Sequence, residues 1–294
     1  MLSRTLALLA ATAVWGGTFV TVKDALDASD AFTFLALRFA VGGLAAAVMG
    51  VGASRALRDW KRVTVPGLKL GVLLYAGYAL QTLGLESTTP ARSAFVTGLT
   101  VLFVPFVTWG LTKQRPQGRA FVAPLLALFG LQRLTGVTWG DALPIGDVLT
   151  LGCAVAYAFH IAATSRLGEG LPALPLTAVQ LTVVSVLSLA SVPFGEHRFA
   201  PTPAYWGAVL FTGIVASALA IGVQVWAQKA LSAVRAAVIY ALEPVFALLW
   251  SALSGLGWPS SSELLGGTFI LLAVLVSEVR FTSPPERTST DAPV

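Results

Sequence analysis

The chain has 294 residues, of which 56% are hydrophobic and only 11% are charged, and its mean hydropathy is +0.79. Soluble domains carry about 25% charged residues, so this composition excludes a water-soluble globular protein. The sequence pI of about 9.7 comes from basic residues in short loops between apolar stretches. We therefore expect no nucleic-acid partner, and we interpret the basic charge as a signal that sets membrane topology.

About ten apolar stretches follow one another along the chain, each long enough to cross a hydrocarbon core of about 30 Å as a helix. The fifth is the weakest, because Pro124, Gln132 and Arg133 interrupt it. In the first half the predicted spans are 5–25, 31–51, 66–86, 92–112 and 117–135. In the second half they are 145–166, 174–194, 204–228, 234–254 and 262–280.

This pattern predicts an all-α integral membrane protein whose partners are the lipid bilayer and a small molecule. Most of the 19 Lys and Arg residues fall in segments that face the cytoplasm if the N-terminus does. The positive-inside rule then places both termini in the cytoplasm, at the cytoplasmic (inner) membrane. The polar segment 136–145 separates a first unit, 1–135, from a second, 146–280, and a polar tail, 281–294, is expected to be disordered and cytoplasmic.

The two units look like copies of each other. Placing Arg92 under Arg235 aligns Leu99 with Leu242, and a similar offset aligns Trp15 with Tyr157 and Gln81 with Gln224. Five helices that start inside must end outside, so the second copy is inverted. Inverted repeats predict a substrate cavity near the midplane where the halves meet, which is typical of transporters.

Short motifs in a preserved order resemble the ten-helix EamA type of the drug/metabolite transporter superfamily. They are Ala13-Val14-Trp15-Gly16-Gly17 with Lys23, Leu37-Arg38-Phe39, Gly146-Asp147, Ala156-Tyr157-Ala158, Ala236-Ala237 and Leu242-Glu243-Pro244-Val245. The resemblance implies a secondary transporter that works by alternating access. Its relatives handle amino acids, sugars, nucleotide-linked and phosphorylated sugars and drugs. We expect export of a small metabolite such as an amino acid, a sugar or a drug-like compound.

Glu243 is the candidate coupling residue, because its predicted position is close to the bilayer midplane and ionisable groups there need a partner or water. The alternative is structural, since Glu243 and Pro244 could simply hydrogen-bond and bend a packed helix. The first repeat has Thr100 and Val101 at the matching positions, so any role needing this pair is asymmetric. If Glu243 carries a proton, transport is proton-coupled.

Arg38 has two interpretations, which we weight equally. In the first it is a fixed cation that binds a substrate carboxylate or phosphate. In the second its long side chain snorkels outward to the membrane surface. Its repeat counterpart is Gln180, and pairing with Glu243 is a third interpretation. His160 is interpreted as structural. The full set of candidate substrate-binding residues is Trp15, Arg38, Tyr78, Gln81, Tyr157, Gln224 and Tyr240.

Two other classes of function are weaker. An intramembrane enzyme would need chemistry from Glu243, His160 and Arg38 alone, because the sequence has no HExxH or GxSxG motif and no acidic pair at metal-ligand spacing within a span. A membrane scaffold gives no reason for an inverted repeat. We predict no enzymatic activity, no cofactor and no metal site; Cys153, the single cysteine, is interpreted as core filler, and a homodimer is left open.

Overall fold

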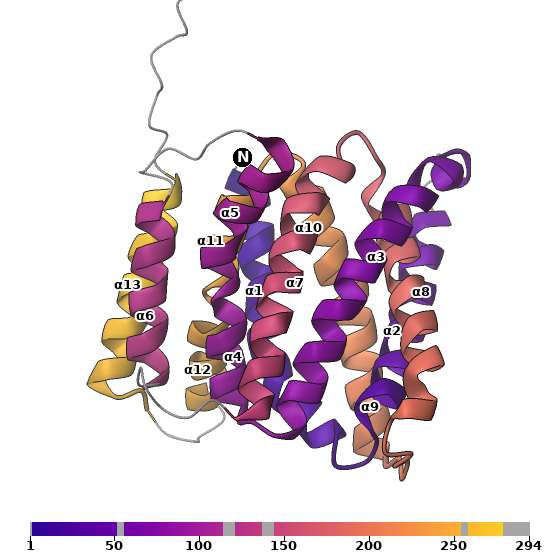
Figure 1. Cartoon of the computed structure of the whole chain (residues 1–294), viewed down its shortest axis with the longest axis horizontal. Helices are drawn as coiled ribbons and strands as arrows, with labels where there is room; N and C mark the ends of the chain where they lie inside the picture. The colour runs from indigo at the N-terminus through magenta and orange to yellow at the C-terminus, as the bar shows by residue number, and fades with distance from the viewer. Residues whose placement is uncertain (1, 52–55, 114–120, 137–143, 254–257, 279–294) are drawn as a thin grey trace, which may run out of the picture.

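The computed structural model describes residues 2–51, 56–113, 121–136, 144–253 and 258–278, and in these ranges the regular elements are helices. The first half contains α1 (Leu2–Ala25), α2 (Ala31–Val51), α3 (Ala56–Glu86), α4 (Pro90–Gly98), α5 (Thr100–Thr112) and α6 (Val122–Thr135). The second half contains α7 (Ile145–Leu167), α8 (Ala173–Ser191), η2 (Val192–Phe194), α9 (Pro203–Phe211), η3 (Thr212–Leu219), α10 (Ala220–Gln228), α11 (Ala233–Tyr240), α12 (Glu243–Leu253) and α13 (Ser261–Glu278). Figure 1 shows them side by side in one bundle.

The predicted spans are confirmed as helices. Eight helical stretches in the described ranges are long and apolar enough to cross a membrane, and α6 and α13 are shorter apolar helices. The third span starts earlier than predicted: α3 begins at Ala56, whereas the predicted span begins at residue 66. The helix extends because Val63 and Leu70, seven residues apart on one face, are both fully buried. Most of the inter-repeat segment and the whole 281–294 tail lie outside the described residues.

Two spans are broken near their middle, at matching places in the repeats. The fourth consists of α4 and α5 with Leu99 between them, and the ninth consists of α11 and α12 with Ala241 and Leu242 between them. Leu99 and Leu242 are the residues that the repeat alignment pairs. Pro244 is the second residue of α12, where its missing N–H costs no helical hydrogen bond. The predicted bend therefore lies just before Glu243, where the regular α-helix is interrupted at Ala241 and Leu242.

The halves are inverted relative to each other. Lys23, near the end of α1, binds carbonyls at the end of α3, and Asp147, near the start of α7, binds Thr88 just after α3. The end of α1 and the start of α7 therefore share one face of the bundle, so α1 and α7 run in opposite directions. We call this the distal end and the end carrying the N-terminus the proximal end (top of Figure 1).

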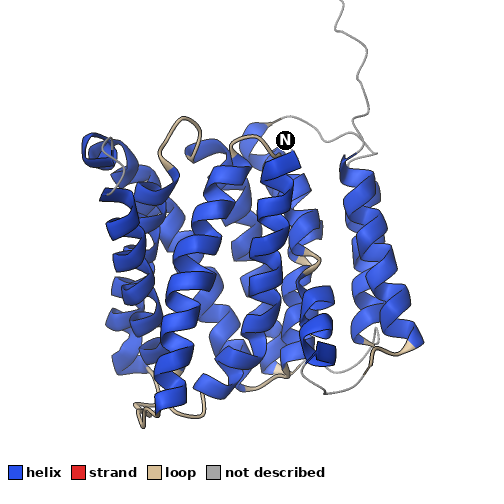
Figure 2. Ribbon diagram, turned by 180° about the vertical axis from the view of Figure 1, so that it is seen from behind, coloured by secondary structure: helices blue, strands red, loops and turns tan. Residues whose placement is uncertain are grey.

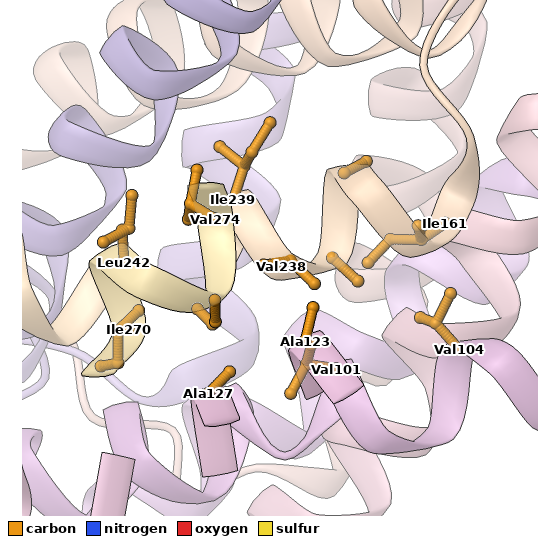
Figure 3. Packing of buried hydrophobic residues seen from close by; sticks show 14 of the residues in the cluster. Val101, Val104, Ala123, Ala127, Ile161, Val238, Ile239, Leu242, Ile270 and Val274 are labelled. Carbon is orange, nitrogen blue, oxygen red and sulfur yellow. The ribbon is translucent and has the colours of Figure 1, made fainter. Parts of the chain in front are cut away.

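Helix packing follows the same two-fold relation. The contacts of α3 with α7 and α8 are matched by those of the span α9-η3-α10 with α1 and α2. The equivalent helices α2 and α8 pack on each other, as do α6 and α13, which form the pair at the edge of the bundle in Figures 1 and 2. A buried cluster, partly shown in Figure 3, joins that pair to α5, α7 and α11. The fold is a ten-span bundle of two inverted five-helix repeats.

Glycines allow the closest crossings between helices, for example at Gly42 and Gly266. A Cβ added to Gly42 would lie 2.8 Å from the carbonyl oxygen of Gly213, and one added to Gly266 would lie 2.6 Å from that of Gly130. These distances are shorter than any normal carbon–oxygen contact. The crossing at Gly42 brings α2 against η3, which positions the part of α2 that carries Arg38.

Candidate functional site

A cavity of about 90 Å³ lies between the two repeats. That volume exceeds the ~10–15 Å³ that one ordered water needs, so polar groups on its wall can be hydrated. Its lining comes from α1, α2 and α3, from both sides of each broken span, and from α7 and α10. The eight residues singled out from the sequence all border it: Trp15, Arg38, Tyr78, Gln81, Tyr157, Gln224, Tyr240 and Glu243. Their roles in binding and coupling stay predictions.

Gln81 connects three helices on one side of the cavity. Its amide nitrogen donates to the hydroxyl of Thr97 in α4 at 3.1 Å, and its amide oxygen accepts from the hydroxyl of Tyr157 in α7 at 3.3 Å. The Tyr157 ring is packed edge-on against that of Tyr78, with centroids 5.5 Å apart. The sequence analysis did not single out Thr97, although the repeat alignment pairs it with Tyr240.

The matching residue Gln224 belongs to a network centred on Gln228, which was also missed. The Gln228 amide oxygen accepts from Gln224 at 3.0 Å and from the Tyr240 hydroxyl at 3.5 Å, and its nitrogen donates to the Ile161 carbonyl and the Ser165 hydroxyl, each at 2.9 Å. This one buried amide ties α7, α10 and α11 together at the proximal side of the cavity.

Arg38 points inward, so the outward-snorkelling interpretation is wrong. The side chain is 2% exposed, and its Nε donates to the hydroxyl of Ser217 at 3.1 Å. Its guanidinium lies 4.8 Å from the ring centre of Tyr78 and 5.0 Å from that of Phe39. Within the described chain it forms no ion pair with Glu243, so the pairing considered from the sequence is absent in this conformation.

The partner of Arg38 lies in η3, a π-helical segment in the middle of the eighth span. Ser217 donates to the carbonyl of Thr212, five residues earlier, and the indole of Trp15 donates to the carbonyl of Ala216 at 2.7 Å. π-helical turns often occur at functional sites because they re-aim side chains. Here the wider turn presents Ser217 and Ala216 to the α1 and α2 side of the cavity.

Glu243 is the first residue of α12 and borders the cavity where the ninth span is interrupted. Among the described residues its carboxylate has no hydrogen-bond or ion-pair partner. Thr100, its counterpart in the first repeat, instead uses its hydroxyl to bind the carbonyls of Thr97 and Ala154 at 2.6 and 3.1 Å. The repeats therefore place a satisfied neutral group and an unpartnered carboxylate at equivalent positions.

His160 belongs to the cavity wall, whereas two aromatic residues of neighbouring helices do not. His160 borders the cavity, is 1% exposed and hydrogen-bonds through Nε2 to Gln180 at 2.8 Å. Tyr75 of α3 hydrogen-bonds to Ser191 at 2.6 Å, and the ring of Trp226 in α10 lies under the guanidinium of Arg4. Neither Tyr75 nor Trp226 is part of the cavity wall.

Charged side chains link the helices at the distal end of the bundle. The ammonium of Lys23 donates to the carbonyls of Leu85, Glu86 and Thr88 at 2.6, 3.1 and 3.4 Å. Asp147, 2% exposed, accepts from the Thr88 hydroxyl at 2.7 Å and from Nε and an amino group of Arg92 at 2.9 and 2.5 Å. We call Lys23, Thr88, Arg92 and Asp147 the distal clamp; it holds the α3–α4 turn against α1 and α7.

At the proximal end the symmetry-related positions carry groups of different chemistry. The repeat alignment pairs Lys23 with Ser165, Leu85 with Gln228 and Asp147 with Thr5. The Thr5 hydroxyl is buried and has no hydrogen-bond partner in the part of the chain that the structure describes. Just beyond Gln228, burial and, second, the Arg4 cation lower the pKa of Lys229, whose ammonium donates to the carbonyl of Leu171. The helices are therefore held together by an ion pair at the distal end and by amide and hydroxyl groups at the proximal end.

Close packing of α1 on α12 positions Glu243, and this gives a direct test. A Cβ added to Gly16 would lie 2.6 Å from the Glu243 carbonyl oxygen and 2.9 Å from the Ala247 nitrogen, so the backbone of α12 must move. We expect Gly16→Ala to cost about 1–3 kcal/mol of stability and to impair transport. At Gly17 the nearest atoms belong to the Trp250 ring at 3.5 Å, an ordinary contact. Gly17→Ala is the matched control, and equal melting temperatures in detergent for the two variants would contradict this account.

Broken helices that meet at a cavity between inverted repeats are the architecture of membrane transporters, and the chain is a multi-pass membrane transporter. The model of the EamA-like transporter family matches residues 3–134 and again residues 144–278. The chain belongs to this family, which confirms the resemblance stated from the sequence.

Two relatives and one solved structure agree with this assignment. An uncharacterized transporter of Archaeoglobus fulgidus is 30% identical over 267 residues, covering 91% of this chain and 83% of the relative. The uncharacterized transporter YvbV of Bacillus subtilis is 26% identical over 194 residues, covering 64% of this chain and 63% of the relative. A crystal structure with 22% identity superposes with a TM-score of 0.78, covering 94% of this chain and 97% of that chain, and shows the shared fold.

Proposed function

We propose that the protein is a proton-coupled secondary transporter that moves a small metabolite out of the cell by alternating access, without changing it chemically. It lies in the cytoplasmic membrane with both termini in the cytoplasm, so that the distal clamp faces outward. The substrate binds in the cavity against Trp15, Tyr78, Gln81, Tyr157, Gln224 and Tyr240. Arg38 and Glu243 supply the only fixed cation and the only carboxyl group among the described residues of its wall.

The observation that carries this proposal is the position of Glu243. A carboxyl group in a membrane interior is costly unless it is paired, neutralised by a proton or hydrated. Glu243 has no partner among the described residues, borders a cavity large enough for water, and stands where its helix is interrupted. A group so placed can exchange a proton with whichever side the cavity opens to. The chemically different contacts at the two ends of the bundle support a cavity that opens at one end at a time.

Transport in sealed vesicles tests the proposal. We expect purified protein in liposomes to accumulate at least one member of a panel of amino acids, organic acids, sugars and cationic drugs when a pH gradient is imposed. Accumulation should collapse when a protonophore dissipates the gradient, and protein-free liposomes are the control. If the protein moved panel members at a rate independent of the gradient, proton coupling would be wrong, and if it moved none of them the transport proposal would fail.

A further inference from the structure

We propose that Arg38 makes the cavity a site for organic monoanions, so that the transported metabolite carries a carboxylate that binds together with a proton on Glu243. This inference rests on the proposed function and adds to it the chemical class of the substrate and the sign of the coupling. It follows from the surroundings of Arg38, from the charges on the cavity wall and from the arrangement of η3.

Arg38 is a buried cation without an anion. It is 2% exposed, and in the described chain its contacts are the Ser217 hydroxyl and the faces of Phe39 and Tyr78, all of them uncharged. Removing a guanidinium from water costs several kcal/mol of free energy, and its contacts with aromatic faces offset only a part of this cost. An anion bound in the cavity would therefore stabilise the buried cation of Arg38.

The geometry leaves the free end of the guanidinium for a ligand. Ser217 holds Nε, and Ser217 is itself held by its bond to the Thr212 carbonyl inside η3. The two terminal amino groups have no hydrogen-bond partner among the described residues, and the side chain borders the cavity. Two adjacent N–H groups of one guanidinium match the two oxygens of a carboxylate. Tyr78, under the guanidinium, and Tyr157 offer aromatic faces to the apolar part of such a ligand.

Charge balance links the anion to the proton. The ionisable groups that share the cavity wall with Glu243 are Arg38 from α2, Tyr78 from α3, Tyr157 and His160 from α7, and Tyr240 from α11. Cys153 of α7 is not part of the wall but interacts electrostatically with Glu243. α1 contributes no ionisable side chain to the wall. A carboxylate on Arg38 beside an ionised Glu243 leaves one uncompensated negative charge, whereas with a protonated Glu243 the charges cancel. Anion and proton therefore favour each other's binding, and they cross together without net charge. Export then occurs when the outward gradient of the metabolite exceeds the inward gradient of protons.

Ligand-induced thermal stabilisation in detergent tests the inference. It uses three sets of probes, and within each set the members share an apolar group and carry a negative, neutral or positive head group. We expect acetate, benzoate and indole-3-acetate to be ranked above their amides and above the corresponding amines, by at least about tenfold in affinity for the best carboxylate. Arg38→Gln, which copies the counterpart Gln180, should abolish the preference for anions. Arg38→Lys keeps the charge and should retain a weaker preference. Carboxylates that stabilise no better than their amides, or a preference that survives in Arg38→Gln, would overturn the inference.

Two further readouts separate this role from a structural one and from the proposed function. If Arg38 serves only to brace η3, Arg38→Gln lowers the melting temperature of the ligand-free protein; as an anion site its loss leaves that temperature unchanged or higher, because an unpaired buried charge is removed. Carboxylate binding should tighten on acidification in the natural protein and become independent of pH in Glu243→Gln. Selective carboxylate binding without this pH dependence would retain the anion site and contradict proton coupling.

Discussion

Replacing Glu243 by Gln is expected to abolish proton-driven accumulation in liposomes, down to the level of protein-free vesicles, and to leave exchange of substrate across the membrane intact. Gln keeps the size and hydrogen-bonding capacity of the side chain but cannot release a proton. The cavity of the variant therefore behaves as if Glu243 were always protonated. Substrate still binds and the protein still changes conformation, but no proton gradient can be converted into a substrate gradient.

The measurement compares uptake driven by a pH gradient with counterflow, in which unlabelled substrate inside the vesicles drives entry of labelled substrate. Glu169→Gln is the matched control, because Glu169 is an exposed carboxylate in the loop between α7 and α8. The control should behave like the natural protein in both assays. If Glu243→Gln retained gradient-driven uptake, Glu243 would have only the structural role considered from the sequence. If it lost counterflow as well, the residue would be needed for binding or folding.

Replacing Asp147 by Asn is expected to weaken the distal clamp and to open the cavity at that end. The carboxylate accepts bonds from Thr88 and from two nitrogens of Arg92 in a site that is 2% exposed. An amide keeps one such bond but loses the charge and one acceptor oxygen. Hydrogen bonds to charged groups are worth about 1.5–3 kcal/mol, so we expect a loss of about 2–3 kcal/mol from the distally closed state. This corresponds to a tenfold or larger increase in the open population.

Cysteine labelling can follow this opening, because Cys153 is the single cysteine of the chain. In a Cys153→Ala background, Val22→Cys places a thiol on the cavity wall near the distal clamp. We expect a polar maleimide to label it at least about tenfold faster when Asp147→Asn is added.

Arg198→Gln is the control for the clamp variant. Arg198 also lies at the distal end, but its contacts with Glu86 at 4.0 Å and Glu196 at 3.4 Å are solvent-exposed and worth about 0–1 kcal/mol. It should leave the labelling rate nearly unchanged. Melting curves identify variants that have simply lost their fold. Folded Asp147→Asn protein that labelled no faster than the control would show that the clamp does not hold the cavity closed.

Much of the site was accessible to sequence reasoning because the chain contains two copies of one design. Gln81 and Gln224 were chosen because they occupy equivalent positions, and both border the cavity. The pairing of Leu99 with Leu242 also marks the two helix interruptions, although the sequence analysis did not interpret it so. Thr97 and Gln228 were missed because a threonine or glutamine in an apolar helix has no distinctive signal until its partners are known.

The sequence by itself determined the class of architecture, because a bilayer demands apolar helices of sufficient length and a duplicated chain keeps equivalent residues in register. It also singled out Glu243 and Arg38, which both border the cavity, since ionisable groups are rare in such helices. Only the tertiary structure decided that Arg38 points inward to Ser217, 179 residues away, that Trp15 bonds Ala216, 201 residues away, and that Asp147 clamps Thr88. These outcomes depend on which helices pack together, and a hydrogen bond between distant residues leaves no periodicity in the sequence.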